Sequence, residues 1–515
     1  MKRVTPMTRN LPLLGLVIVA IIVCLPIVGN NYLPLVDLPN HMARQYIAVT
    51  PGTPLDEYYA YEFKAKGNSA ADLIWFVAAH KWLTVETFSN WVFAVYGAGL
   101  VFSVSVLWRV VHGRWGYWPL ASALLVYNAP FFWGFQNFLL TIPFAILALA
   151  LWLALEPVKA GWRALLFMPV CYVLYQMHTL GFSVLLFSAF GREVHRLILA
   201  RRDVYAKLVS TLVSATSFLI PVSIAVAQAV NGPTNLYGSL TEFGGLPERI
   251  RALRSPFFAT PAIDYPMAAG LSIATMAFFI FVLLSLRRRT GPRLQFASKL
   301  TGPVISLAIL SAVLPFRLDG VALVNIRFPF VVLALVIGGT AWRGMQRHNV
   351  IALVAAALVL GGLRIGQVDW VFSRHSDEIA DLRTVLSEVP KGARLLTVRM
   401  SPPDREHRMW HVQAHAVPVA QAFVPTLFQG AHGLTVKPAW RDRSIAQGAS
   451  LSAQLLFNVD PSSNSYAHDT QSAYWQGWKE KFNVLLTLDP LPAEIVTKNG
   501  LSLVSMEGRF ALYTF

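Results

Sequence analysis

Long uncharged runs constrain this chain more than any other feature of the sequence. Leu11–Val28 and Met267–Leu286 contain no charged residue, and each is long enough to cross a hydrocarbon layer of about 30 Å. The composition agrees, because 55% of the residues are hydrophobic and only 14% are charged, whereas soluble domains have roughly 25% charged residues. A disordered, collagen-like or disulfide-rich chain is therefore excluded, and a polytopic membrane protein is predicted.

Hydropathy predicts about eleven membrane-spanning helices. They cover residues 11–29, 88–111, 117–134, 138–155, 164–177, 179–191, 208–229, 266–286, 299–315, 325–342 and 349–366. The fifth and sixth are short and form either two spans or one kinked helix, which leaves the count open by one or two. Basic residues precede the first run, but no small-residue cleavage site ends it, so we interpret it as an uncleaved membrane helix rather than a signal peptide.

The formal net charge of +16 indicates an orientation in the membrane. Lys and Arg accumulate in short cytoplasmic loops. With a cytoplasmic N-terminus, the cytoplasmic rim holds 19 basic and three acidic residues, and the opposite membrane loops hold 10 basic and 11 acidic residues. An odd number of spans then places loops 30–87 and 230–265, together with the C-terminal region, outside the cytoplasm. The charge excess consequently gives no support to nucleic-acid binding.

The predicted organisation has two parts. Residues 1–369 form a transmembrane domain with the two extracytoplasmic loops, and residues 370–515 form an extracytoplasmic, periplasmic α/β domain, because hydropathy falls after about residue 370. Within the second part, 376–389 has helical periodicity, and 394–398, 483–488, 501–505 and 510–515 are predicted strands. No internal repeat is visible.

The most informative segment follows the first span and reads PLVDLPNHMAR, from Pro34 to Arg44. If a helix begins after Pro39, His41 and Arg44 share one face of it. Asp37 would precede that helix as a general base or a ligand of a divalent cation. The alternative is that Asp37 caps the helix and Arg44 binds lipid phosphates.

Further candidate residues lie at the ends of spans on the same predicted outer side. Arg327 begins an apolar helix, where an unpaired charge is costly, and its planar guanidinium suits a phosphate. It could instead pair with Asp319 or extend to lipid headgroups. His178, at a span end, is either a hydrogen-bonded structural residue or a base. The amphipathic segment 247–254 is either a mobile lid over a lipid-linked substrate or an interfacial surface helix.

The C-terminal part offers weaker signals. His407, His411 and His415 recur every four residues and would stack on one face of a helix, as in some zinc or copper sites, but no further ligand completes a site. The aromatic residues Trp440, Tyr474, Trp475 and Trp478 could stack on sugar rings or fill a core. No phosphate-binding loop, dinucleotide fingerprint, hydrolase elbow or zincin motif occurs.

An Asp directly after the first span, a multi-span body and a C-terminal extracytoplasmic α/β domain together resemble the GT-C glycosyltransferases, which take sugars from polyprenyl-phosphate carriers. The short motifs Gln136-Asn137-Phe138, His178-Thr179-Leu180-Gly181 and Asn325-Ile326-Arg327-Phe328 look like those of a bacterial subgroup of such transferases. In this resemblance Asp37 matches the acidic base. The loop has no paired acidic motif, and Asp56, Glu57 and Glu62 are the candidates for a second acid.

The resemblance implies an inverting hexosyl or pentosyl transferase of a bacterial inner membrane, with an envelope glycan, lipid or protein as acceptor. Its implied catalytic residues are Asp37 and His41. The implied substrate-binding residues are Arg44, Arg317, Arg327, His178 and Glu57. No metal site is assigned, a divalent cation stays open as a cofactor, and the partners are the lipid-linked sugar, the acceptor and membrane lipids.

Two rival functions are a transporter or flippase and a non-catalytic component of an envelope polysaccharide assembly system. A transporter would place charges along a path at mid-membrane, whereas here they gather at the predicted outer rim, which favours the enzyme. The GT-C interpretation also predicts that Asp37, Arg327 and loop 230–265 converge on one outer cavity.

Overall fold

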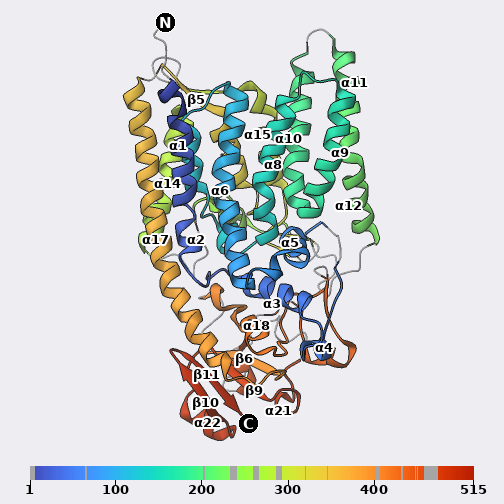
Figure 1. Ribbon diagram of the computed structural model, residues 1–515, viewed down its shortest axis with the longest axis vertical. Coiled ribbons are helices and arrows are strands. Elements are labelled where there is room, and N and C mark those ends of the chain that lie inside the picture. Colours follow the sequence, from blue (N-terminus) through green and yellow to red (C-terminus); the bar gives the residue numbers. More distant parts are fainter. Residues whose placement is uncertain are drawn as a thin grey trace.

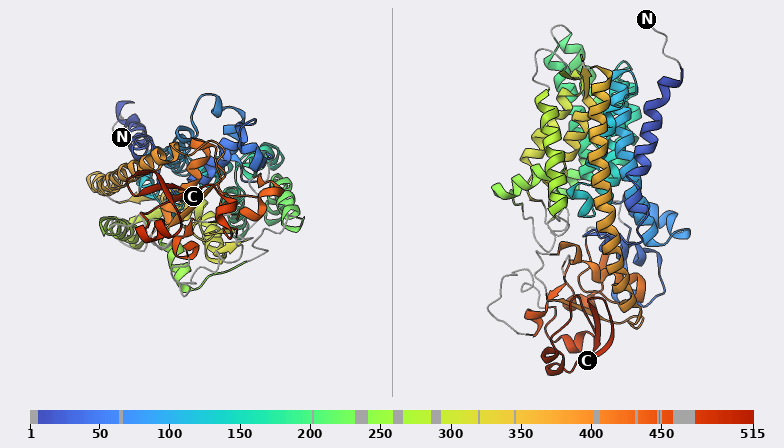
Figure 2. Two further views of the ribbon diagram at one scale, coloured as in Figure 1. Left: turned by 90° about the horizontal axis from the view of Figure 1, so that it is seen from below. Right: turned by 90° about the vertical axis from the view of Figure 1, so that its left-hand side faces the viewer.

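The molecule is elongated, with a bundle of helices at one end and a smaller unit of strands and short helices at the other (Figure 1). The described N-terminal helix lies in the bundle, and the C-terminus lies at the far end of the smaller unit (Figure 2). The computed structural model describes residues 6–63, 67–200, 203–231, 241–258, 266–285, 293–318, 321–344, 346–400, 406–430, 433–446, 448, 450–457 and 474–515.

The bundle consists of long apolar helices. They are α1 (Pro6–Ile22), α6 (Val85–His112), α8 (Gln136–Ala154), α9 (Ala160–Met177), α10 (Thr179–Ile198), α11 (Val204–Ala215), α12 (Leu219–Asn231), α14 (Pro266–Ser285), α15 (Thr301–Val313), α16 (Pro329–Gly339) and α17 (Arg347–Ser387). In the described part of the chain, five helical segments are long and apolar enough to cross a membrane: Leu11–Val28, Val85–His112, Gln136–Ala154, Val204–Gln228 and His348–Ser387. The larger count of eleven spans and the orientation stay predictions.

Two details of the bundle bear on the predicted spans. The fifth and sixth are separate helices, α9 and α10, which meet at His178. Residues 117–134 do not form one regular helix, since they contain a 3-10 helix, η2 (Trp118–Leu125), and the short α7 (Ala129–Phe132). All of η2 is buried, and proline stands near the start of both segments, where it fits a helix N-terminus but not its interior. High hydropathy here reflects burial within the protein.

The segment between the first two long helices, α1 and α6, is folded and packs on the smaller unit. It holds α3 (Leu38–Val49), α4 (Leu55–Tyr58), β1 (Tyr59–Tyr61), α5 (Ala70–Val77) and η1 (Ala79–Lys81), and follows the short α2 (Leu25–Val28). Strand β1 pairs antiparallel with β7 (Leu434–Val436), with Tyr59 opposite Val436. Ala43, Ile47 and Tyr58 belong to the same hydrophobic core as the C-terminal strands. The segment is therefore built into the smaller unit.

A five-stranded mixed sheet forms the centre of that unit, in the order β10-β11-β9-β6-β8. The strands are β6 (Leu395–Arg399), β8 (Leu451–Ser452), β9 (Val484–Thr487), β10 (Ser502–Glu507) and β11 (Phe510–Thr514). Strand β6 is parallel to β8 and β9, and the other two pairings are antiparallel. Four of these strands coincide with predicted ones. The short helices are α18 (Ala416–Ala420), α19 (Ala453–Phe457), α21 (Trp478–Lys481) and α22 (Ala493–Lys498).

One helix belongs to both parts of the molecule. Helix α17 has 41 residues, which gives a length of about 60 Å at 1.5 Å per residue, and it runs from the bundle down to the sheet (Figure 1). Val354 lies in the core of the bundle, whereas Leu382 and Val385 lie in the core of the smaller unit. Helix α17 thus connects the bundle directly to the unit that holds the sheet and the segment between α1 and α6.

The remaining short elements close turns of the chain. They are α13 (Leu246–Arg254), the strand pair β2 (Arg293–Phe296) and β5 (Thr340–Arg343), the pair β3 (Arg317–Leu318) and β4 (Val321–Ala322), and the 3-10 helices η3 (Thr216–Phe218), η5 (Ser298–Leu300), η7 (His407–Met409), η8 (Val412–His415) and η9 (Pro438–Arg443).

Candidate functional site

Asp37 stands at the N-terminal cap position of α3, but its carboxylate makes no capping hydrogen bond. Pro39, in the first turn of α3, lacks the backbone N–H that such a cap would satisfy. The side chain is 18% exposed, so it is largely enclosed and still reachable. Asp37 therefore does not act as a simple helix cap, and its carboxylate is available for other contacts.

The backbone at Asp37 is held by a turn of the chain between η2 and α8. The amide of Asp37 donates to the Trp133 carbonyl at 3.0 Å, and that of Val36 donates to the Phe132 carbonyl at 3.2 Å. Gly134 follows with φ +77°, and a Cβ there would lie 3.1 Å from the Leu38 nitrogen. Glycine therefore allows both the left-handed backbone and the close approach of the two segments.

Two nitrogen-bearing side chains lie near the Asp37 carboxylate. His411 Nε2, from the C-terminal unit, is 3.7 Å from Asp37 Oδ1, and the positive charge of Arg327 acts on the same group. Burial raises the pKa of Asp37 to about 7, although Arg327 opposes the rise. Burial has this effect because it disfavours the charged form. A carboxyl with such a pKa can both accept and release a proton near neutral pH.

Arg327 lies directly before α16 and is 7% exposed. Its guanidinium stacks 4.1 Å from the ring centre of Phe135 and 5.6 Å from that of Phe138. Its buried Nε has no hydrogen-bond partner among the described residues. A buried guanidinium without a bonded anion is energetically costly, and an anionic ligand would remove that cost. The aromatic rings fix the orientation of the group.

Arg44 is bonded to a different carboxylate, that of Asp72 on α5. Its Nη2 lies 2.8 Å from Asp72 Oδ1 and 2.9 Å from Oδ2, and Arg44 is 1% exposed. Asn137 Nδ2 also donates to Asp72, at 3.0 Å. Burial tends to raise the pKa of Asp72, but Arg44 and these hydrogen bonds hold it below its usual range. Arg44 therefore lies in a closed ion pair rather than at a surface open to lipid phosphates.

His41 occupies the predicted position on the face of α3 that carries Arg44. Its Nδ1 lies 3.1 Å from Arg44 Nη2, and its ring meets the edge of Phe428 with centres 5.9 Å apart. The prediction that His41 and Arg44 share one helix face is confirmed. The structure joins His41 to the ion pair of Arg44 and Asp72 through this contact.

The other predicted site residues, His178, Arg317 and Glu57, make contacts in different parts of the structure. His178 caps α10, where its Nδ1 accepts from the amides of Leu180 and Gly181, and its ring packs on Phe138, which also carries Arg327. Arg317, on β3, pairs with Glu242 at 3.7 Å. Glu57 is exposed on α4, which packs on the C-terminal unit. Among the described contacts of these three residues, that of His178 with Phe138 brings it beside a ring on which Arg327 also stacks.

Loop 230–265 reaches the same place through α13. The Ser255 hydroxyl donates to the Ile326 carbonyl at 3.0 Å, and Asn325 Nδ2 donates to the Glu248 carbonyl at 3.3 Å. These contacts flank Arg327 on the chain and bring the loop beside it, whereas the predicted cavity shared with Asp37 stays a prediction. Leu246 and Leu253 of α13 are more than 70% exposed. Asp319, the proposed partner of Arg327, lies outside the described residues, as do 232–240 and 259–265.

The three spaced histidines do not stack on one helix, because two 3-10 helices and the turn between them replace the expected α-helix. His407 packs on Trp133, with ring centres 5.5 Å apart, His411 faces Asp37, and His415 lies 3.3 Å from Arg383 Nη1. In the described part of the chain no three His, Cys, Asp or Glu side chains group as metal ligands.

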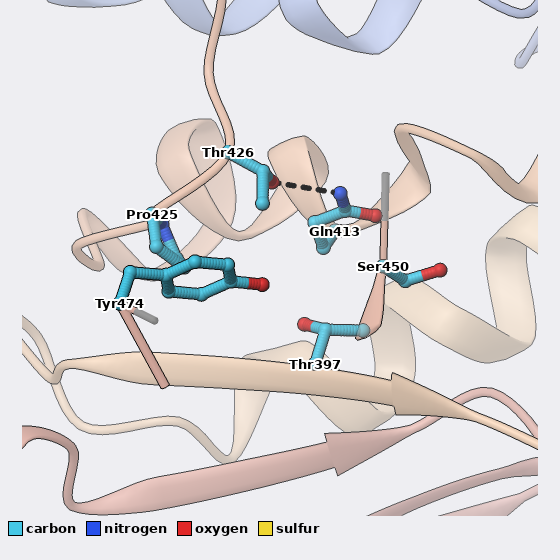
Figure 3. A pocket seen from close by; sticks show the side chains of 6 residues that line it. All are labelled: Thr397, Gln413, Pro425, Thr426, Ser450 and Tyr474. Carbon is cyan, nitrogen blue, oxygen red and sulfur yellow. Dashed lines mark hydrogen bonds between the residues drawn. The ribbon is translucent and has the colours of Figure 1, made fainter. Parts of the chain in front are cut away.

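Aromatic residues of the C-terminal unit fill its core. Trp440 packs edge-on against Tyr58, with centres 4.7 Å apart, and Trp478 packs against Phe515 at 4.4 Å. A small polar pocket lies nearby, where Gln413 Nε2 donates to Thr426 Oγ1 (Figure 3). Its lining consists of Thr397, Gln413, Pro425, Thr426, Ser450 and Tyr474. The pocket includes neither Asp37 nor Arg327.

Sequence reasoning missed two partners of this site, Asp72 and His411. Asp72 is a lone acid in the apolar run Ala70–Val77, and a single charge in such a run signals a buried partner. The contact of His411 with Asp37 joins positions that are far apart in sequence, and no local pattern indicates it.

The fold is similar to that of two solved structures of one protein, ArnT. No family model matches the sequence, and no curated protein matches it. The crystal structure of ArnT from Cupriavidus metallidurans bound to undecaprenyl phosphate superposes with a TM-score of 0.53 at 9% identity, covering 98% of each chain. The apo structure of the same protein gives a TM-score of 0.53 over 97% of each chain. The chain therefore shares the fold of ArnT over nearly its whole length.

Proposed function

We propose that the protein is an integral membrane glycosyltransferase that moves a sugar from a polyprenyl-phosphate carrier to an envelope glycan, lipid or protein at the outer face of a bacterial inner membrane. The observation that carries the proposal is that Asp37, a reachable carboxyl with a pKa near 7, feels the charge of Arg327, a buried cation whose Nε has no hydrogen-bond partner among the described residues. The shared fold supports it, since one ArnT structure holds undecaprenyl phosphate.

In this proposal the phosphate of the carrier binds at Arg327, where the guanidinium offers paired N–H donors to two phosphate oxygens. Arg317, which begins β3 and lies 3.7 Å from Glu242, is 20% exposed and is a second cation for the same headgroup. The rings of Phe135 and Phe138 keep the Arg327 guanidinium oriented and exclude water, which strengthens its attraction for the phosphate.

Asp37 then acts as the general base. It removes the proton of an acceptor hydroxyl while the oxygen attacks the anomeric carbon, and the bond from that carbon to the phosphate oxygen breaks. The polyprenyl phosphate leaves from the opposite face of the sugar with the bonding electron pair, so the anomeric configuration inverts. The pair Arg44–Asp72 and His41 hold α3 in place, and so they support Asp37 without meeting the sugar.

The test is sugar transfer by the full-length protein in vesicles containing undecaprenyl phosphate linked to labelled hexoses or pentoses. Asp37→Asn should lose at least a hundredfold in rate, because general base catalysis typically contributes about 10²–10⁴-fold. Glu388→Gln removes an exposed acid at the end of α17 and serves as the matched control, with the rate of the wild type. Full transfer by Asp37→Asn would overturn the assignment, and translocation of the lipid without transfer would instead support the flippase.

A further inference from the structure

The C-terminal unit places one side chain against the Asp37 carboxylate. We propose that His411 is a positioning residue of the transfer site: its Nε2–H faces Asp37 and holds the carboxylate in the orientation in which it accepts a proton. The inference deepens the proposed function and rests on it for the role of Asp37. It makes the C-terminal unit a part of the reaction site as well as a cover for it.

The geometry fixes His411 from several sides. The residue is 4% exposed and directly precedes η8, all of whose residues are buried. Its ring meets the edge of Phe428 with centres 5.1 Å apart, and the Phe428 amide donates to Asn40 Oδ1 on α3 at 3.3 Å. Because Phe428 also packs on His41, one aromatic ring ties His411 to the helix that begins at Asp37.

The charge state follows from the surroundings of the imidazole. Burial lowers the pKa of His411 to about 4, a hydrogen bond with the Gly448 backbone opposes this shift, and the charge of Arg399 on β6 adds to it. Among the described residues, the charged groups that act on this histidine and on Asp37 are Arg399 and Arg327. His411 is neutral near pH 7, so it does not keep the proton that Asp37 takes up. A carboxylate opposite Nε2 favours the tautomer with the proton on Nε2.

The separation of 3.7 Å is slightly longer than a hydrogen bond. Catalytic hydrogen bonds are often long before substrate binds and shorten in the complex. A neutral N–H donor to a carboxylate stabilises the charged form and thus opposes the effect of burial on Asp37. Removal of His411 should consequently raise the pKa of Asp37 further and leave the carboxylate less oriented.

The experiment measures the protonation of Asp37 directly and needs no sugar substrate. Dicyclohexylcarbodiimide reacts with protonated carboxyl groups, so the extent of Asp37 labelling against pH, read by mass spectrometry of the full-length protein, gives its midpoint. His411→Phe should raise that midpoint by about one pH unit, since a hydrogen bond to a charged group contributes about 1.5 kcal/mol. His411→Gln, which keeps an N–H donor near Nε2, should restore it.

His112→Phe is the matched control, because His112 is the last residue of α6 and packs on Trp108, so it should leave the labelling midpoint unchanged. His411→Met provides a second apolar variant if the phenylalanine disturbs folding. In transfer assays the apolar variants should lower kcat more than they raise KM. An unchanged midpoint in folded apolar variants would overturn the inference, whereas full transfer by Asp37→Asn would overturn the proposed function alone.

Discussion

Arg44 and Asp72, which stand 28 residues apart in the chain, form a two-pronged ion pair in which Arg44 Nη2 contacts both carboxylate oxygens at 2.8 and 2.9 Å. The pair joins α3 to α5, and Asn137 at the start of α8 donates to the same carboxylate. Three elements therefore meet at one buried charge pair, a short distance along α3 from Asp37.

We expect the loss of either partner of this pair to destabilise the protein strongly. Asp72→Asn leaves the Arg44 guanidinium buried without a countercharge, at a cost of about 3–5 kcal/mol in the free energy of unfolding. The double variant Arg44→Met/Asp72→Leu removes both charges and should be more stable than either single variant. Unfolding in detergent micelles measures the three values, and single variants as stable as the wild type would contradict the expectation.

The pH dependence of transfer should follow the protonation of Asp37. Its pKa is raised to about 7 by burial, and only the ionised carboxylate accepts a proton. The rate should therefore rise about tenfold per pH unit below that midpoint and level off above it. Measurement of kcat/KM across the midpoint checks this, and an acid limb near the ordinary Asp pKa would show that the carboxyl is not enclosed in the working enzyme.

Arg327 should determine how tightly the carrier phosphate binds. Arg327→Met removes the guanidinium and should weaken the binding of undecaprenyl phosphate by about 10–100-fold. Arg327→Lys keeps the charge but loses the planar guanidinium, so its affinity should lie between those of the wild type and Arg327→Met. Native mass spectrometry in detergent measures the affinity. Arg251→Met, an exposed arginine on α13, is the control, and equal affinity of Arg327→Met and the wild type would remove Arg327 from the phosphate site.

Gly134 should be required for the position of Asp37. Gly134→Ala adds a Cβ 3.1 Å from the Leu38 nitrogen and 3.3 Å from that of Asp37, in a residue with φ +77°. Gly113 has nearly the same φ, +75°, with open space around its Cβ, so Gly113→Ala carries the cost of the left-handed backbone alone. We expect Gly113→Ala to lose about 1 kcal/mol of stability, Gly134→Ala to lose more because of the added contacts, and only Gly134→Ala to lose kcat; equal kcat in the two would contradict this.

Local patterns predicted the parts of the site that depend on short stretches of chain. Pro39 indicated where α3 begins, and helical spacing then placed His41 beside Arg44. Such features follow from neighbouring residues, because the backbone of a helix fixes which side chains share a face.

The parts that failed depend on distant segments. Residues 117–134 have the hydropathy of a span, but their burial comes from packing inside the bundle, which composition does not distinguish from contact with lipid. The spacing of His407, His411 and His415 predicts stacking only if an α-helix forms there, and the buried turn between η7 and η8 instead directs each ring to a different neighbour. Asp72 escaped notice because its partner lies on another helix.

The pairing of β1 with β7 has a consequence for biosynthesis. Tyr59 of β1 stands opposite Val436 of β7, and the Tyr59 hydroxyl also donates to the Val424 carbonyl, 365 residues along the chain. At about 5–20 residues per second, β1 is therefore made at least some 20–70 s before its partner strand. During that interval Tyr59 has no core in which to be buried, and the edge of β1 is unpaired. A truncated chain that lacks β7 and the strands after it would leave both Tyr59 and β1 exposed.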